Sequence, residues 1–185
     1  MRAREVPTEK AYCFDFDETL VKTDAKVHIY KNGRQINSIT PAEYNFYKPK
    51  PGETTDMRDF DDPRFIIKAK KYKMWPALRN ISMAKEAGRS SSDIFILTAR
   101  GEKAQLPIYN FLKKQGIEIP LDHIITVGEE DGNYDIAAKK KEVLLKISNS
   151  YQSVIFFDDS HKNIELANEV PGIKTRLIDS LEYIK

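Results

Sequence analysis

The tripeptide Asp-Phe-Asp occurs twice in the chain, at residues 15–17 and again at residues 59–61. Two carboxylates one residue apart can act as a nucleophile and an acid–base group, provided that the backbone holds them rigidly. The first copy follows the apolar run Ala11–Phe14, which predicts a buried strand. The second copy lies in a polar stretch before Pro63, which favours a solvated loop over a segment at a substrate edge. The first copy is therefore the candidate for chemistry.

Two other apolar runs end in polar groups that complement the first pair. The run "IFIL" is followed by Thr98, Ala99 and Arg100, and the run "VIFF" is followed by Asp158 and Asp159. The carboxyl ends of parallel strands meet at one sheet edge, so we expect these groups to converge. Carboxylates that converge raise one another's pKa values unless a cation is present. Mg²⁺ is the expected cation, because proteins hold it by one or two carboxylates with waters and phosphate oxygens.

A phosphate group at this edge needs a positive charge, and three adjacent lysines, residues 139–141, are the candidates. Helical periodicity places Lys140 on an apolar stripe with Leu144 and Ile147, and turns Lys139 and Lys141 to the side or outward. Lysine runs are usually solvated, and that interpretation stays open for all three. The phase of the stripe favours Lys140 as the lysine of the site.

Short apolar runs alternate with helical patterns along the rest of the chain. This alternation predicts an α/β fold: a three-layer sandwich with a mostly parallel, Rossmann-like sheet. In the second predicted helix we expect Leu106, Tyr109, Phe111 and Leu112 to face inward. The predicted strands are 10–16, 93–99, 122–128, 153–159 and 173–178, and the predicted helices are 76–88, 102–115, 134–148 and 160–169.

Residues 21–75 are too many for a simple crossover between the first strand and the next clear helix. Asn32-Gly33 lies between two β-like runs within 27–38 and predicts a hairpin. The stretch 47–64 is rich in proline, glycine and charge and predicts irregular chain. We therefore expect one domain over 1–185, with a small hairpin-containing cap insertion at about 21–75.

Composition limits the classes of protein. The 185 residues carry a net charge of +2, with 41% hydrophobic and 31% charged residues, which is typical of a globular domain. One cysteine, Cys13, excludes a disulfide framework and is interpreted as a small buried hydrophobe. No apolar run approaches a membrane span, and the polar first residues lack a signal-peptide pattern, so a cytoplasmic protein without membrane contact is expected.

Four segments together resemble the motifs of the haloacid dehalogenase-like hydrolases, a superfamily of phosphatases with an aspartate nucleophile. They are "DFDET", "ILTAR", a helical lysine before the fourth strand, and "FFDDS". A departure is Glu18, which stands where many members have glycine, so the turn there lacks glycine's freedom at positive φ. A receiver domain also clusters aspartates, but its motif order differs.

The resemblance implies a role for each motif residue. It implies that Asp15 is the nucleophile, forming an aspartyl-phosphate, and that Asp17 is the acid and then the base. Thr98 and the N–H of Ala99 would hold phosphoryl oxygens. The implied phosphate-binding residues are Thr98, Ala99, Arg100 and Lys140. The implied Mg²⁺ ligands are Asp15, Asp17, Asp158 and Asp159.

The region from "ILTARG" to "FFDDS" is also similar to the 3′-phosphatase domain of polynucleotide kinases. This implies a phosphorylated substrate, either a nucleic-acid 3′ end or a nucleotide. Arg100 and four other basic residues either contact a nucleic-acid backbone or are ordinary solvated charges; the four are Lys48, Lys50, Arg58 and Arg64. A small-metabolite phosphatase and a catalytically silent binding module of the same fold stay open as alternatives.

Overall fold

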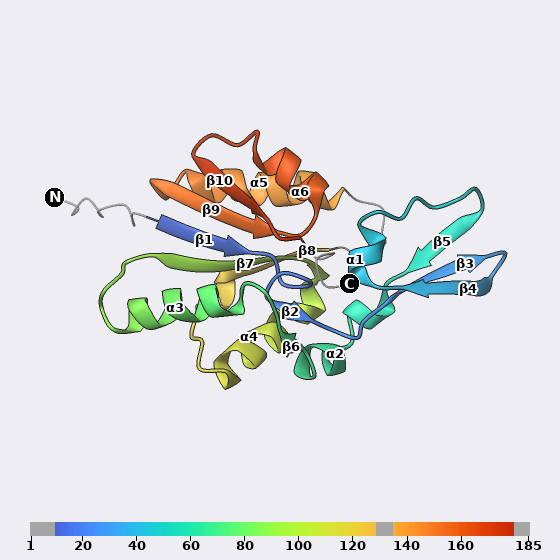
Figure 1. Cartoon of the computed structure of the whole chain (residues 1–185), viewed down its shortest axis with the longest axis horizontal. Helices are drawn as coiled ribbons and strands as arrows, with labels where there is room; N and C mark the ends of the chain where they lie inside the picture. The colour runs from blue at the N-terminus through green and yellow to red at the C-terminus, as the bar shows by residue number, and fades with distance from the viewer. Residues whose placement is uncertain (1–9, 129–134, 180–185) are drawn as a thin grey trace.

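The computed structural model describes residues 10–128 and 135–179. A five-stranded sheet forms its centre, in the order β10-β9-β1-β7-β8, and each strand pairing in it is parallel (Figure 1). The strands are β1 (Lys10–Phe14), β7 (Asp93–Gly101), β8 (Ile124–Gly128), β9 (Ser153–Asp158) and β10 (Ile173–Leu177).

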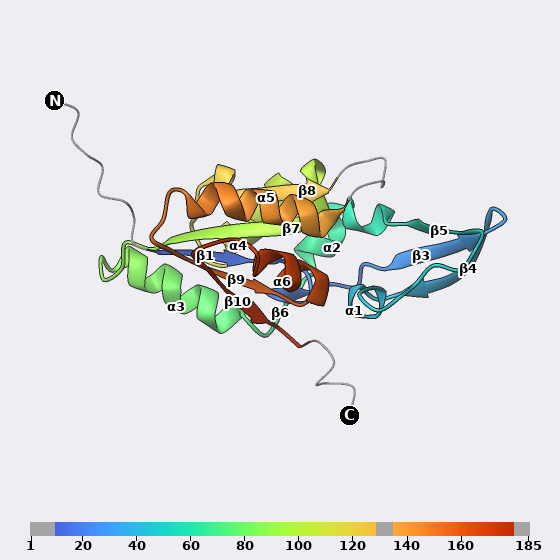
Figure 2. The same ribbon diagram turned by 90° about the horizontal axis from the view of Figure 1, so that it is seen from above.

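Helices cover both faces of this sheet. α3 (Trp75–Glu86) and α4 (Gln105–Lys114) lie on one face, and α5 (Ile136–Ser148) and α6 (His161–Ala167) lie on the other (Figures 1 and 2). The predicted α/β three-layer sandwich is therefore confirmed. No helix among the described residues has the length and apolar character needed to span a bilayer.

The alternation of side chains along β1 explains why both faces are covered. Phe14 packs into one apolar cluster with residues of α3 and α4, and Ala11 and Cys13 pack into a second cluster with residues of α5. Cys13 is fully buried, as its apolar surroundings in the sequence predict. A strand with two buried faces is held firmly along its length, which fixes the position of the residues that follow it.

Local sequence sets the ends of the helices. The side chain of Asp135 accepts hydrogen bonds from the N–H groups of Ala137 and Ala138 at the start of α5, and Ser160 caps α6. The predicted helix 102–115 divides into a 3₁₀ turn, η2 (Glu102–Ala104), and α4. Pro107 lies in the first turn of α4, where a missing N–H costs little.

Two sequence predictions about these elements are wrong in detail. Leu106 faces solvent with 55% of its surface exposed, because the buried stripe of α4 is formed by Ile108, Phe111 and Leu112, and Leu106 lies on the opposite side of the helix. The third strand begins at Ile124, since residues Leu121–His123 form a 3₁₀ turn, η3. The start predicted for α5 at residue 134 lies outside the described residues.

Between β1 and α3 the chain forms two small antiparallel sheets. The larger has the order β4-β3-β5 and extends away from the main sheet (Figure 1). The predicted hairpin is confirmed, with Asn32 at φ 51° and Gly33 at φ 73° between its strands. The elements are β3 (Val27–Lys31), β4 (Arg34–Ile39), the short helix α1 (Pro41–Tyr44) and β5 (Glu53–Asp56).

The irregular chain predicted for 47–64 is wrong in part. It contains β5, the 3₁₀ turn η1 (Arg58–Phe60) and the start of α2 (Pro63–Ile67). The strand β5 has the sequence Glu-Thr-Thr-Asp and buries none of its side chains fully, so it lacks the apolar alternation that signals a strand.

The second small sheet is a two-stranded ribbon of β2 (Val21–Lys22) and β6 (Lys70–Lys71). It is hydrogen-bonded to the turn that follows β1. The Tyr72 N–H donates to the carbonyl of Leu20 at 2.8 Å, and the Met74 N–H donates to the carbonyl of Thr19 at 3.0 Å. The ribbon therefore joins both ends of the inserted chain to the turn after the first Asp-Phe-Asp.

Candidate active site

The candidate site residues come from four elements that meet at the carboxyl edge of the sheet. The register pairs Phe14 with Ile96 on one side and with Phe157 on the other. Ile96, Phe14 and Phe157 thus form one row across β7, β1 and β9. Asp15, Thr98 and Asp158 each follow a residue of this row by one or two positions. This is the arrangement expected when ligands bind beyond the ends of parallel strands.

Asp15 is buried, with 5% of its surface exposed, and its N–H and both of its carboxylate oxygens have hydrogen-bond partners. Its N–H donates to the carbonyl of Phe157 at 2.8 Å, which continues the ladder between β1 and β9. One carboxylate oxygen accepts from Lys140 Nζ at 2.7 Å and the other from Thr19 Oγ1 at 3.3 Å. Burial raises the pKa of Asp15 to about 7, against the opposing attraction of Lys140.

Lys140 lies between two carboxylates inside the site. Its Nζ donates to Asp15 Oδ1 and to Asp158 Oδ2, each at 2.7 Å, and 1% of its surface is exposed. Burial alone would lower the pKa of Lys140, but the two carboxylates raise it above its ordinary value. Among the three adjacent lysines, Lys141 instead pairs with Glu169, and Lys139 borders a separate pocket.

Asp158 is fixed by donors from the start of α6. Its oxygens accept from the Ser160 N–H at 2.8 Å and from Asn163 Nδ2 at 3.0 and 3.1 Å. Asn163 is buried and was not identified from the sequence. A polar residue three positions after the capping Ser160, on the side of the helix that faces a strand end, is the signal that could have found it.

Asp159 completes a cluster of three carboxylates with Asp15 and Asp158, whose ligand oxygens lie within 4.8 Å of one another. Burial, with the charges of Asp15 and Asp158, raises the pKa of Asp159 to about 9. Asn45 Nδ2, from the inserted chain, donates to Asp159 at 2.7 Å. Oxygen donors crowded in this way fit a hard divalent cation, which would relieve the repulsion between them.

Asp17 lies apart from this cluster and forms a two-point ion pair with Arg100. Arg100 Nε and Nη2 each donate to the carboxylate of Asp17 at 2.8 Å, and Nη1 donates to the carbonyl of Phe60 at 2.7 Å. The side chain of Arg100 is almost fully buried. The phosphate-binding role expected for Arg100 stays a prediction, and in this structure its guanidinium holds Asp17.

The end of β7 carries the two remaining predicted phosphate-site residues. Thr98 is buried and its Oγ1 accepts from the Arg100 N–H at 3.2 Å, whereas Ala99 is exposed. Gly128 on β8 packs against this segment so closely that an added Cβ would lie 2.4 Å from the carbonyl oxygen of Ala99. Only glycine fits there, and no pattern in the sequence predicts this contact.

The turn after Asp17 has the backbone strain that the sequence suggests. Glu18 adopts φ 58°, a left-handed conformation that glycine tolerates better. Its side chain is buried, burial raises the pKa of its carboxyl, and Oε2 has no hydrogen-bond partner. The Glu18 N–H donates to the carbonyl of Val21 at 2.8 Å, which closes the turn toward the ribbon.

The second Asp-Phe-Asp copy is not simply a solvated loop. Asp59 pairs with His28 Nε2 at 3.1 Å and accepts from the Lys26 N–H at 3.0 Å. The Phe60 ring lies 5.1 Å from the guanidinium carbon of Arg100. This copy therefore packs on the site from outside, through one backbone carbonyl and one ring.

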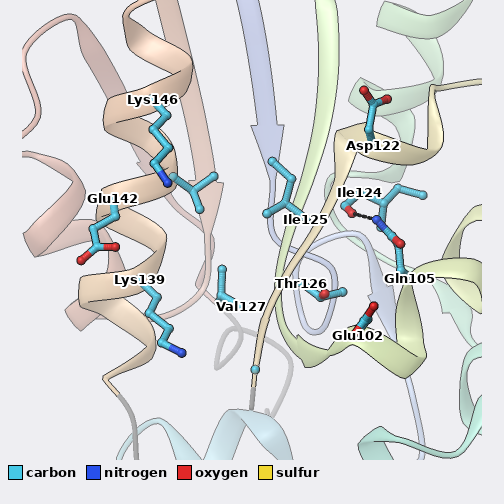
Figure 3. Close-up of a pocket in the computed structure, with 12 residues that line it drawn as sticks. Glu102, Gln105, Asp122, Ile124, Ile125, Thr126, Val127, Lys139, Glu142 and Lys146 are labelled. Carbon is cyan, nitrogen blue, oxygen red and sulfur yellow. Dashed lines mark hydrogen bonds between the residues drawn. The ribbon is translucent and has the colours of Figure 1, made fainter.

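A separate pocket lies along the edge strand β8, between η2 and α5 (Figure 3). Gln105 Nε2 donates to the carbonyl of Ile124 at 2.8 Å on one side of it, and Lys139, Glu142 and Lys146 border the other side. No residue of the carboxylate cluster lines this pocket, so it is distinct from the candidate site.

Comparison of the sequence with protein-family models and with curated proteins gives no match. The fold is similar to chains in two structures of the Pnkp1/Rnl/Hen1 complex, the first described as an RNA repair complex. Their TM-scores are 0.57 and 0.53, with 16% and 18% sequence identity. The alignments cover 95% and 92% of this chain but 44% and 45% of those chains, so this chain spans less than half of their length.

A haloacid dehalogenase-like family hydrolase from Streptococcus pneumoniae aligns with a TM-score of 0.41 and 13% identity, over 90% of this chain and 83% of that one. A likeness at that score carries no argument. The likeness to the chains of the RNA repair complex shows that this chain shares their α/β fold.

Proposed function

We propose that this protein is a Mg²⁺-dependent phosphomonoester hydrolase in which Asp15 is the nucleophile. The observation that carries the proposal is the burial of Asp15 against Lys140 at the end of a parallel strand, with Asp17 two residues away in a different electrostatic setting. We assign attack to the first carboxylate and proton transfer to the second, because two-step hydrolysis requires this division of roles.

In the first step an oxygen of Asp15 attacks phosphorus, and the bond between phosphorus and the leaving oxygen breaks. Asp17 donates a proton to that oxygen, so the product leaves as an alcohol. Thr98 Oγ and the N–H of Ala99 are proposed to hold the phosphoryl oxygens. Lys140 offsets negative charge on Asp15 and on the phosphoryl group, which favours in-line transfer.

In the second step Asp17 takes a proton from water, and the water oxygen attacks the phosphorus of the aspartyl-phosphate. The bond between phosphorus and Asp15 breaks, so the carboxylate is restored and inorganic phosphate leaves. Asp17 thus gives one proton and regains one in each cycle. In the structure Arg100 donates to both oxygens of this carboxylate, so one of the two contacts must open for Asp17 to carry a proton, and the other keeps the carboxylate in place.

The proposed Mg²⁺ ligands are Asp15, the backbone carbonyl of Asp17, Asp158 and Asp159. The cation supplies positive charge that lets three neighbouring carboxylates and a phosphate dianion occupy one site. Asn163 and Asn45 hold Asp158 and Asp159 by hydrogen bonds, so the donor set is supported from both α6 and the inserted chain.

Hydrolysis of p-nitrophenyl phosphate tests this function, with Mg²⁺ and with chelator, followed by acid quenching and peptide mass analysis. We expect that turnover requires the metal. We also expect mass analysis to find a phosphoryl group on the peptide that contains Asp15. A phosphorylated peptide elsewhere, or turnover that persists equally in Asp15→Asn, would contradict the proposal. No turnover on any phosphorylated compound would favour a catalytically silent binding module.

A second, finer candidate is a polynucleotide 3′-phosphatase acting within a single domain whose insertion forms a cap. The similarity to chains of an RNA repair complex favours it over a small-metabolite phosphatase. A substrate panel decides between them. It compares nucleotides and sugar phosphates with 3′-phosphorylated DNA and RNA ends, and a preference in kcat/KM for the oligonucleotide ends supports the finer candidate.

A further inference from the structure

The ribbon of β2 and β6 concentrates positive charge in a chain whose net charge is only +2. Four of the six residues from 68 to 73 are lysines, and Lys22 lies on the partner strand. We call this surface the lysine ribbon; it comprises the exposed residues Lys22, Lys68, Lys70 and Lys71. These residues were not identified as functional from the sequence.

The register of the ribbon is unfavourable for the ribbon itself. Lys22 pairs directly with Lys70 across the two strands. Like charges at opposed positions of an antiparallel pair destabilise it. A neutral pair at these positions would therefore stabilise the fold more than the two lysines do. Binding of a negatively charged ligand would explain why lysines occupy them.

The ammonium groups of the ribbon are open to solvent. Lys22, Lys68, Lys70 and Lys71 are exposed, and within residues 10–128 and 135–179 none of them forms an ion pair with a carboxylate. The carboxyl of Glu18 acts on Lys22 and Lys73, but it is buried beneath them. Their charge is thus available at the surface.

Aromatic rings hold some of these lysines in place. The Nζ atoms of Lys22 and Lys73 lie 5.6 and 5.8 Å from the ring centroid of Tyr72, and Lys71 Nζ lies 5.4 Å from that of Trp75. Cation–π contacts of this kind cost the ammonium none of its hydrogen-bonding capacity. Lys22 and Lys71 are thus positioned while their ammonium groups remain exposed to solvent.

The arginines first considered for a nucleic-acid backbone differ from these lysines. Arg58 pairs with Asp56, Arg64 pairs with Asp62, and Arg100 pairs with Asp17. Each of these cations already has a carboxylate partner. Lys48 and Lys50 are exposed and, like the ribbon lysines, have no carboxylate ion pair among the described residues, but only the ribbon brings several such lysines onto two paired strands.

The lysine ribbon also adjoins the candidate active site. Met74 and Tyr72, which follow β6, donate backbone hydrogen bonds to Thr19 and Leu20 in the turn after Asp17. A polyanion lying on the ribbon would therefore approach the turn that carries the catalytic pair. A small phosphate ester bound in the site carries only the charge of its own phosphoryl group, whereas a polyanion carries further phosphates that the ribbon could contact.

We propose that the lysine ribbon binds the phosphodiester backbone of a nucleic-acid strand whose phosphorylated end occupies the candidate active site. This inference rests on the proposed function and names the class of substrate for that site. Because lysines contact phosphates and not bases, the ribbon binds DNA and RNA strands without regard to sequence.

Fluorescence anisotropy tests this binding directly, with labelled 3′-phosphorylated DNA and RNA oligonucleotides in the presence of chelator, so that no turnover occurs. The variant is Lys22→Gln/Lys70→Gln/Lys71→Gln in the full chain. We expect its Kd to rise about tenfold at about 50 mM KCl, and the slope of log Kd against log salt to fall by about 2, because single strands give roughly 0.7 per phosphate contact.

A matched variant removes the same charge elsewhere: Lys113→Gln/Lys114→Gln/Lys146→Gln, three exposed lysines of α4 and α5. It should bind oligonucleotides within about twofold of the wild type. For the ribbon variant, kcat/KM with p-nitrophenyl phosphate should stay within about twofold of the wild-type value. Its melting temperature should be equal or higher, because the opposed lysines are gone.

Three results would overturn the inference: no oligonucleotide binding by the wild type, equal losses in the two triple variants, or binding to anionic vesicles in place of oligonucleotides. The proposed function fails separately. A protein that binds strands through the ribbon but hydrolyses no phosphate ester would lose the hydrolase proposal and keep this one. Hydrolysis without any effect of the ribbon lysines on binding would do the reverse.

Discussion

The two Asp-Phe-Asp copies have the same three residues and opposite surroundings. The first follows a parallel strand with a neighbour on each side, and its Asp15 is buried against Lys140. The second spans a 3₁₀ turn and the residue after it, and its Asp59 binds the imidazole of His28 and a backbone N–H. The comparison teaches that the strand before a carboxylate, rather than the spacing of the acids, creates a site.

Arg100 connects the two copies. It donates two hydrogen bonds to the side chain of Asp17 and one to the backbone carbonyl of Phe60. The first copy contributes a carboxylate to this contact, and the second contributes a backbone carbonyl and the ring of Phe60. The second copy can therefore influence the site by position, without a chemical role for its own acids.

Replacing the first acid of each copy gives the largest expected difference. Asp15→Asn removes the proposed nucleophile, and we expect kcat/KM with p-nitrophenyl phosphate to fall about 1,000-fold or more. Asp59→Asn keeps the shape of its turn and should lower kcat/KM by no more than about threefold, since its contacts lie on the surface. Steady-state kinetics at saturating Mg²⁺ measures both, and similar losses in the two variants would break the comparison.

Weakening the link between the copies should impair proton transfer rather than binding. In Arg100→Gln we expect kcat to fall about 100-fold with alkyl phosphates, whose leaving oxygen needs a proton, and about tenfold or less with p-nitrophenyl phosphate. Arg100→Lys should recover part of the loss with alkyl phosphates. Equal losses for both leaving groups, with a raised KM, would instead support direct contact between Arg100 and the phosphate.

The crowded carboxylates should make stability depend on pH in a direction set by Asp159. Its pKa is raised to about 9, so over the range from about 4 to 9 Asp159 holds more protons in the folded protein than in the unfolded chain. The free energy of unfolding in chelator therefore falls as pH rises through that range. In Asp159→Asn the fall should be shallower, with stability about 1 kcal/mol above wild type at pH 8 after allowance for solvent screening.

Urea unfolding at several pH values measures this effect. Asp61→Asn, which removes an exposed acid of the second copy, is the matched control and should leave the pH profile unchanged. Adding Mg²⁺ to the wild type should raise its stability at pH 8, as binding to the folded state requires. A wild-type profile that rises with pH would contradict the repulsion described at the site.

The residues that follow the two copies give the smallest difference. Glu18→Gly relieves a left-handed backbone and a buried, unpartnered carboxyl oxygen. We expect a gain of up to about 1 kcal/mol, reduced by the extra freedom of glycine in the unfolded chain. Asp62 caps α2 through its side chain, so Asp62→Gly should cost a few tenths of a kcal/mol, about 0.3. Thermal melts of the two variants should therefore shift in opposite directions.

Much of the sheet could be predicted because its strands are short, apolar and buried on both faces. The same runs end in Asp15, Thr98 and Asp158, so their meeting at one edge followed from the parallel order. The partners of those residues could not be predicted in this way. Asn45 lies 114 residues from Asp159, and Gly128 matters only because β8 approaches Ala99. Such contacts depend on tertiary geometry that leaves no periodic pattern.

The inserted chain was the least predictable region for a related reason. Strand β5 is polar, and the ribbon strands are two residues each, so neither carries the alternation on which strand prediction depends. The hairpin was the exception, because Asn-Gly has a local conformational preference that needs no tertiary support. In this region the local turn could be predicted from the sequence, and the strand pairings that depend on long-range packing could not.

The pairing of Val21 with Lys71 has a consequence for engineering. The inserted chain leaves the core at β2 and returns to it at β6, and these two strands are adjacent. The segment between them could therefore be replaced as a unit. A tight two-residue turn could join the ribbon strands directly and leave the five-stranded parallel sheet intact. Such a miniature would keep the buried pair of Asp15 and Lys140 and lose the contact of Arg100 with the carbonyl of Phe60, and it offers a scaffold onto which other insertions could be grafted.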